Sequence, residues 1–120
     1  MKDIVRALKQ TIKKGEYKQC SRKLSDGEGA FCFLGLMCEV YRQQTGDGEW
    51  AVDESKTRIG FRVDDCDYTS FGCLPVRVAG WFGVKFRTQS NIAMVNDDCA
   101  NTSFKMIWEK FLERKTKGKK

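Results

Sequence analysis

The sequence predicts an α+β fold: a mainly helical single domain around a buried central helix at about residues 30–44, with a small antiparallel β-hairpin at about residues 57–72. The central helix is predicted because residues 30–41 are almost all apolar and contain one charged residue, Glu39. A helix that is apolar on nearly all sides belongs in the interior of a domain. The hairpin is predicted because apolar and basic residues alternate over residues 57–63, which is typical of a half-buried strand.

Two amphipathic helices are predicted near the ends of the chain. Residues 3–14 carry apolar side chains at helical spacing and end at Gly15, a residue suited to the position after a helix. Residues 104–112 carry a second apolar stripe, and Asn101, Thr102 and Ser103 are the candidates for its N-cap.

Shorter elements are predicted between the hairpin and the last helix. Pro75 suits the first position of a short helix that ends at Gly83, and Ser90 begins a short turn that runs to Val95. In the hairpin, residues 68–71 are expected to pair back onto the first strand. A glycine inside the central helix, Gly35, indicates a close contact with another helix.

We expect residues 1–114 to form one globular domain and residues 115–120 to form a basic disordered tail. The first residues lack the apolar segment of a signal peptide, and no apolar run is long enough to cross a bilayer. These features predict a cytoplasmic protein with no membrane contact.

The net charge of +6 is distributed unevenly along the chain. Residues 1–24 hold eight basic and two acidic residues, residues 25–104 hold seven and twelve, and residues 105–120 hold seven and two. Basic ends around an acidic middle allow contact with an acidic partner. The other interpretation is that the basic residues only form solvated helix faces and a solubilising tail.

Six cysteines and no histidine limit the metal chemistry that the chain can support. A structural zinc site would need four thiolates, and no Cys-x-x-Cys pair is present to start one. We therefore expect no metal site and no cofactor, with most cysteines acting as small buried apolar residues. Cys66 and Cys73 can meet across the predicted hairpin, and the sequence leaves their pairing open.

The sequence carries no recognised catalytic constellation, so no catalytic residue is predicted. Without histidine, Ser–His and Cys–His nucleophile pairs are excluded. No phosphate-binding or dinucleotide-binding glycine motif is present. Cys20 lies between Lys18 and Arg22, a cationic setting for a thiol, but no partner base stands near it in the sequence.

A set of short motifs runs in order along the chain, from Gly15-x-Tyr17-x-Gln19 through Phe31–Glu39, Leu74-Pro75 and Asn96-Asp97 to Ser103-Phe104 with Ile107. As an ordered set these motifs resemble a family of small uncharacterised proteins from bacteriophages and bacteria. The resemblance covers about residues 15–112, and it implies no known reaction or ligand. It does imply a phage setting, and hence activity in the cytosol of a bacterial host.

The function expected from these observations is a non-enzymatic binding protein that docks on a host macromolecule, most simply a host protein, and modulates or inhibits it. An acidic surface is the predicted partner-binding site, made of Asp53, Glu54, Asp64, Asp65 and Asp67, with Asp47 and Glu49 nearby. Its carboxylates would mimic an anionic ligand.

Two alternatives use other residues. A nucleic-acid-binding accessory protein would contact phosphates through its basic N-terminal helix and tail, with Lys9, Lys13, Lys14, Lys18, Arg22 and Lys23. A ligand-binding protein would use a cleft lined by Tyr17, Gln19, Asn96 and Asp97. These cleft residues also suit a purely structural role, because Asn and Asp readily bind backbone groups at helix ends.

Overall fold

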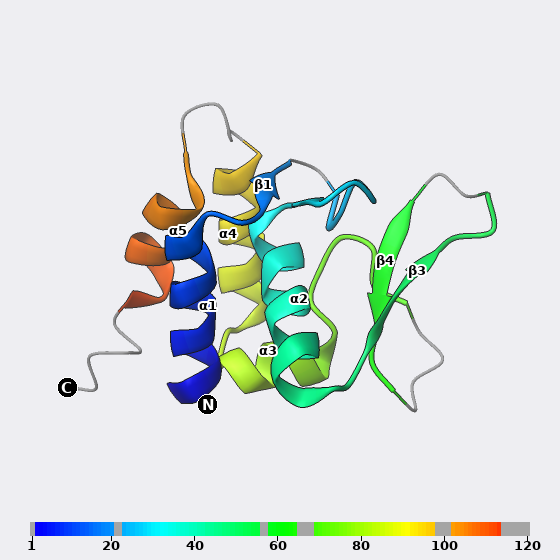
Figure 1. Cartoon of the computed structure of the whole chain (residues 1–120), viewed down its shortest axis with the longest axis horizontal. Helices are drawn as coiled ribbons and strands as arrows, with labels where there is room; N and C mark the ends of the chain where they lie inside the picture. The colour runs from blue at the N-terminus through cyan, green and yellow to red at the C-terminus, as the bar shows by residue number, and fades with distance from the viewer. Residues whose placement is uncertain (1, 21–22, 56–57, 65–68, 98–101, 114–120) are drawn as a thin grey trace.

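The structure is a computed structural model that describes residues 2–20, 23–55, 58–64, 69–97 and 102–113, with the backbone alone for residues 2 and 3. Within these residues five helices and two small sheets follow one another along the chain (Figure 1). The elements are α1 (Lys2–Lys14), β1 (Lys18–Gln19), β2 (Ala30–Phe31), α2 (Phe33–Thr45), β3 (Glu49–Val52), β4 (Ile59–Arg62), α3 (Val76–Phe82), α4 (Phe86–Asn96) and α5 (Phe104–Phe111). The predicted mainly helical α+β fold is confirmed.

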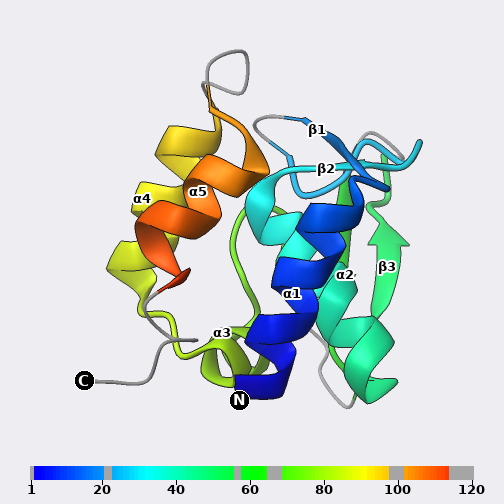
Figure 2. The ribbon, with the colours of Figure 1, turned by 60° about the vertical axis from the view of Figure 1, so that its left-hand side comes forward.

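The helices gather at one end of the molecule, and the β3–β4 hairpin projects from the other (Figure 1). Helices α4 and α5 lie side by side, and α1 packs against α5, α3 and α2 (Figure 2). The short parallel pair β1–β2 crosses above α1 and leads directly into α2. None of the helices in the described part of the chain is long and apolar enough to cross a membrane.

Helix α2 is the centre of the fold. Every residue from Phe33 to Tyr41 is buried, including Leu34 and Leu36 with exposed fractions of 2% and 1%. The helix contacts α1, α3 and α4, so its apolar surface has a neighbour on several sides. It begins three residues later than predicted because Ala30 and Phe31 form β2 and the sulfur of Cys32 caps the helix, accepting the amide of Gly35 at 3.4 Å.

Gly35 makes a close contact, but the predicted helix–helix contact is wrong. A Cβ atom at this position would lie 1.8 Å from the carbonyl oxygen of Leu24. Leu24 belongs to the irregular segment that precedes β2, and its side chain is fully buried. Glycine is required here because the backbone of that segment lies directly on the helix.

The hairpin pairs differently from the prediction. Strand β4 pairs antiparallel with the upstream strand β3, with Trp50 opposite Phe61, whereas the expected partner segment contributes a single bridge between Phe61 and Ser70. The rings of Trp50 and Phe61 lie 5.0 Å apart, and such cross-strand aromatic pairs stabilise a sheet. Strand β3, which packs the Trp50 indole against β4, therefore forms the longer ladder.

The helices that follow the hairpin confirm some boundaries and correct others. Pro75 is the N-cap of α3, one position before the predicted one, and Gly83 ends that helix with a positive φ of 69°. Ser103 is the N-cap of α5, as one of the candidates predicted. The predicted turn from Ser90 to Val95 is instead the second half of the eleven-residue helix α4. Two of its buried positions are polar, and this obscured its helical pattern.

Several sequence predictions fall outside the described residues: the tail at 115–120, Arg22, Asp65, Cys66, Asp67 and Asn101. Cysteines 20, 32, 38 and 73 lie within the described residues, where Cys32 and Cys38 are buried free thiols. Burial raises the pKa of Cys32 to about 11 and raises that of Cys38 well above its ordinary value. These two thiols behave as small apolar core residues.

Candidate functional site

Two of the predicted cleft residues meet inside the protein. Asn96, at the end of α4, has an exposed fraction of 1%. Its Oδ1 accepts from the Nε2 of Gln19 at 2.8 Å and from the amide of Phe33 at 3.1 Å, and its Nδ2 donates to the carbonyl of Cys20 at 2.8 Å. One amide side chain thus joins α4 to β1 and to the first turn of α2. This geometry gives Asn96 a structural role.

The other two cleft residues make different contacts. The Tyr17 ring packs edge-on against Phe31, and its hydroxyl accepts from the Nε2 of Gln43 at 2.9 Å. Asp97 is exposed and forms the C-cap of α4. Of the four residues, the structure shows a direct contact between Gln19 and Asn96, and ligand binding by the four residues stays a prediction.

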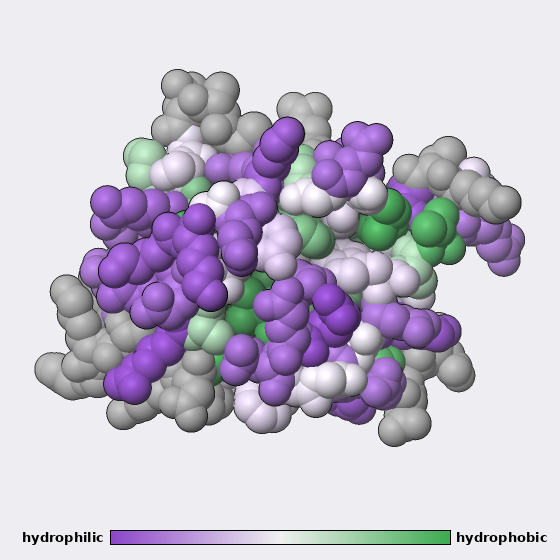
Figure 3. Space-filling model, in the orientation of Figure 1, coloured by the Kyte–Doolittle hydropathy of each residue, from purple (hydrophilic) through white to green (hydrophobic). Residues whose placement is uncertain are grey.

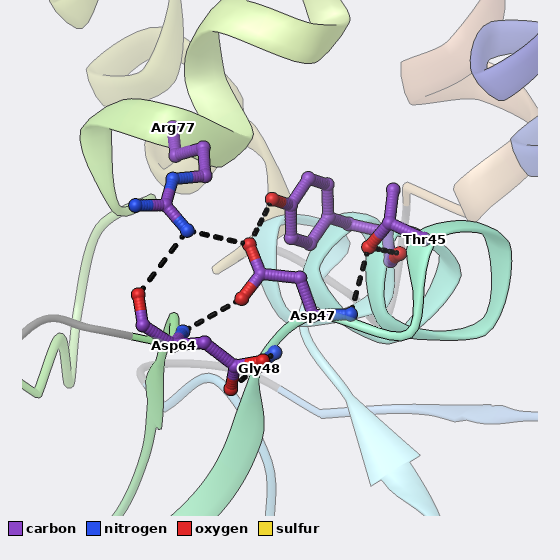
Figure 4. A network of polar contacts seen from close by, with 6 residues as sticks. Thr45, Asp47, Gly48, Asp64 and Arg77 are labelled. Atoms are coloured by element: carbon purple, nitrogen blue, oxygen red, sulfur yellow. Dashed lines mark hydrogen bonds and ion pairs between the residues drawn. The ribbon is translucent and has the colours of Figure 1, made fainter.

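The predicted acidic surface contains a network centred on Asp47, which is drawn in Figure 4. The Asp47 carboxylate accepts from the Tyr41 hydroxyl, from the Arg77 guanidinium at 2.8 Å and from the amide of Asp64 at 2.6 Å. Although burial raises the pKa of Asp47, the hydrogen bonds from Tyr41 and Arg77 outweigh it and hold the pKa at about 2. The network joins the end of α2, the end of the hairpin and helix α3.

Other carboxylates of the acidic surface are also matched by arginines. Glu49 pairs with Arg62 across the hairpin, and Asp53 pairs with Arg58 at 3.3 Å. Glu54 is exposed. Much of the described negative charge is therefore balanced within the chain, which weakens the attraction for a distant cation. Partner binding by this surface stays a prediction.

The predicted basic residues do not form one group: Lys9, Lys13 and Lys14 lie on α1, whereas Lys23 lines a pocket beside Arg58 of the hairpin segment. Hydrophilic side chains gather over α1 and α5 in Figure 3. Lys13, Lys14, Lys18 and Lys23 are exposed, and Lys9 is half-buried. A pocket of about 360 Å³ between α1 and α5 is lined by three lysines, Lys9, Lys13 and Lys105, but also by Glu109 and Glu113. This mixture of charges makes the pocket a weak anion site.

Sequence reasoning noticed Glu39 but missed what it does. Its carboxylate accepts from Arg42 at 2.7 and 3.0 Å, from Gln43 at 2.8 Å and from the indole of Trp50 at 2.8 Å. Burial raises the pKa of Glu39, but these donors outweigh burial and the pKa lies below its ordinary range. The buried carboxylate thus ties α2 to strand β3. All its oxygens are used within the chain, which indicates a structural role.

A larger opening lies between the end of the hairpin and helices α3 and α4. It has a volume of about 760 Å³, within the range of ligand and peptide sites. Among the described residues its lining is mostly apolar, with Arg77 as the one charged residue that they contribute. Two lining side chains project into solvent: Val76 at the start of α3 is 89% exposed, and Phe86 at the start of α4 is 72% exposed. We call this opening the α3–α4 groove.

Two polar side chains in the α3–α4 groove retain unused hydrogen-bonding groups. Gln89 is 6% exposed, and its Oε1 accepts the amide of Leu74 at 3.0 Å, which leaves its Nε2 without a partner among the described residues. The hydroxyl of Ser70 is buried and also makes no hydrogen bond there. Buried polar groups are normally paired, so the Ser70 hydroxyl marks a place where an outside group can bind; the Nε2 of Gln89, which retains some contact with solvent, can also pair with an outside group.

The sequence contained a signal for the α3–α4 groove that was not used. Val76 was assigned to the short predicted helix that ends at Gly83 and Phe86 to a brief extended piece over residues 84–87, and apolar residues are expected to face the core. Both occupy the first position of a helix, where the side chain is free of the preceding turn. Only the tertiary structure shows that they flank one opening.

The fold and the groove define a small α+β protein with a surface suited to binding. The family described as Domain of unknown function (DUF8296) matches residues 1–113, and the chain belongs to this family. The match confirms that the chain is a member of an uncharacterised family. Searches among curated proteins and among solved structures found no match.

Proposed function

We propose that this protein is a non-enzymatic binding protein that docks on a host protein and modulates it, with the α3–α4 groove as its docking surface. The observation that carries the proposal is the exposure of Val76 and Phe86 beside a groove of about 760 Å³. Large apolar side chains grouped at an opening are typical of interaction sites, because water covers them at a cost. A bound partner removes that cost.

The proposal replaces the acidic surface by the groove as the main contact. The described carboxylates Asp47, Glu49 and Asp53 already pair with arginines of the same chain. A partner that bound them would have to compete with those contacts. The apolar side chains at the groove have no such competitor, so the groove gives the larger gain on binding.

The setting we propose is that of a phage protein acting in the cytosol of its bacterial host, as an inhibitor of a host process or of a defence system. This setting follows from the motif resemblance. Small phage proteins without enzymatic motifs commonly act by binding a host macromolecule, and this argument is one of analogy.

The test is affinity capture from nuclease-treated bacterial lysate with the wild-type protein and two variants. Phe86→Ala removes a rim side chain of the groove. Met94→Ala removes an equally exposed apolar side chain of the same helix (71% exposed) that does not line the groove. We expect the wild type and Met94→Ala to retain one specific protein that Phe86→Ala loses, and purified partner to reproduce this order.

The nucleic-acid alternative predicts a different outcome of the same experiment. Its residues are the exposed lysines of α1 and the following segment, and nuclease would then release the captured material. Retardation of DNA or RNA that weakens steeply between low and moderate salt supports this alternative. Charge reversal at Lys9 and Lys13 would abolish it, whereas Phe86→Ala would have no effect.

A further inference from the structure

The α3–α4 groove contains chemical features that restrict what it can bind. Its apolar part comes from Pro75, Val76, Val84 and Phe86, which lie on α3, on α4 and in the segments before them. An apolar side chain of an occupant that enters the groove removes these surfaces from water. The hydrophobic effect makes this burial favourable for binding.

The hydrogen-bonding groups of the α3–α4 groove require an acceptor from the occupant. The Leu74 amide fixes the orientation of the Gln89 side chain, because it can donate only to the oxygen. The Nε2 group of Gln89, which is a donor, is therefore available to an acceptor from the occupant. An apolar ligand would cover this donor without pairing it, which is unfavourable. A backbone carbonyl of the occupant would pair it.

The charges around the groove favour a carboxylate. Arg77 uses one nitrogen for Asp47 and for the Asp64 carbonyl, so its other donors remain available among the described residues. Lys85 and Arg87 are exposed and stand on either side of Phe86 in the sequence. The first turn of α4 has no side-chain cap and no acidic residue, and a helix N-terminus attracts negative charge.

We infer that the α3–α4 groove binds an acidic amphipathic segment of the partner protein: an apolar side chain fills the groove, a backbone carbonyl accepts from Gln89, and a neighbouring Asp or Glu faces the first turn of α4. The inference rests on the proposed function, because it names the partner chemistry of the same groove. It extends that function by specifying which segment of a partner can bind.

A peptide segment fits the groove better than a small carboxylic acid does. Val76 and Phe86 are 89% and 72% exposed, so most of each side chain stands outside the opening. A small molecule within the groove would leave these surfaces in water. A peptide chain continues beyond the inserted residue and covers both rims. It also places a carbonyl and a carboxylate at separate points, as the two binding features require.

The inference is tested with three labelled peptides that share their leucine positions and carry glutamate, glutamine or lysine at the polar positions. Fluorescence polarisation measures their affinity for the full chain. We expect the glutamate peptide to bind at least about tenfold more tightly than the lysine peptide. Phe86→Ala and the charge reversal of Lys85 and Arg87 should each weaken it about tenfold. Met94→Ala and the matched reversal of Lys9 and Lys13 should leave it unchanged.

Gln89→Glu tests the hydrogen bond separately. It keeps an oxygen for the Leu74 amide and replaces the free donor by an anionic oxygen, so the glutamate peptide should lose at least about tenfold in affinity. Circular dichroism checks the folding of this variant. If it does not fold, Phe86→Ala and the charge reversal, which change exposed side chains, still decide the question.

Three results would overturn the inference. The first is that the lysine peptide binds as tightly as the glutamate peptide, the second is that none of the three peptides binds, and the third is that octanoate occupies the groove while the glutamate peptide does not bind. Any one of these results means that an acidic segment is not the ligand of the groove. Capture from lysate is independent of these peptides. A partner lost by Phe86→Ala would then leave the proposed function standing with a different partner chemistry.

Discussion

Replacing Asn96 by alanine tests the main polar contact between segments of this fold. The side chain is 1% exposed and makes three hydrogen bonds, to Gln19, to the Phe33 amide and to the Cys20 carbonyl. Alanine leaves the Phe33 amide as a buried donor without a partner, at about 1–3 kcal/mol. Loss of the other two bonds adds about 0.5–1.5 kcal/mol each. Gln19 keeps its bond to the Thr102 carbonyl, so we take the lower value, about 0.5 kcal/mol, for each of these two bonds and the middle of the range, about 2 kcal/mol, for the Phe33 amide.

We therefore expect Asn96→Ala to lower the free energy of unfolding by about 3 kcal/mol. Urea denaturation followed by circular dichroism measures it, with an expected decrease of about 1.5 M in the midpoint for a slope near 2 kcal/mol/M. The control is Asn91→Ala on the exposed side of the same helix, which should change stability by less than about 0.5 kcal/mol. If the two variants were equally stable, the structural role assigned to Asn96 would be wrong.

Three further predictions concern the core, the Asp47 network and the buried thiols. Gly35→Ala should destabilise the protein by about 2 kcal/mol in thermal denaturation, because the new Cβ meets a carbonyl oxygen at 1.8 Å; Gly80→Ala, with open space around it, should stabilise it by about 0.5–1 kcal/mol, and equal effects would contradict the packing argument. The folded-state pKa of Asp47, about 2, is below its ordinary 3.8, so its contribution is present above pH 3.8 and is lost as the pH falls through about 2. Acid denaturation should show this loss in the wild type and a smaller one in Asp47→Asn. Finally, Cys32 and Cys38 should react with a thiol reagent only after unfolding, because burial raises the pKa of both thiols; rapid labelling of either thiol in the native protein would refute their placement in the core.

The sequence predicted those parts of the fold that depend on local pattern. The apolar run from Phe33 to Tyr41 had no polar face, so its burial followed from composition alone. The stripe of α5 and the glycines after α1 and α3 were recognised because helix periodicity and helix ends involve residues close in sequence. The apolar alternation of β4 was visible for the same reason.

Contacts between distant segments were decided by the tertiary structure. Strand β4 pairs with the upstream strand that contains Trp50, and Gly35 contacts the Leu24 backbone rather than another helix. Asn96 was predicted to line a cleft and Gln89 was given no role, yet both are buried in α4, where each accepts the amide of a distant residue.

The candidate site differed from its prediction for the same physical reason. Charge and composition pointed to the acidic residues, but the arginines that neutralise Asp47 and Glu49 approach only in the folded chain. The α3–α4 groove exists because two helix starts and the end of the hairpin meet in space. The sequence determined which segments are apolar, because hydrophobicity is a property of each individual side chain. Folding decided which apolar side chains, such as Val76 and Phe86, remain in water.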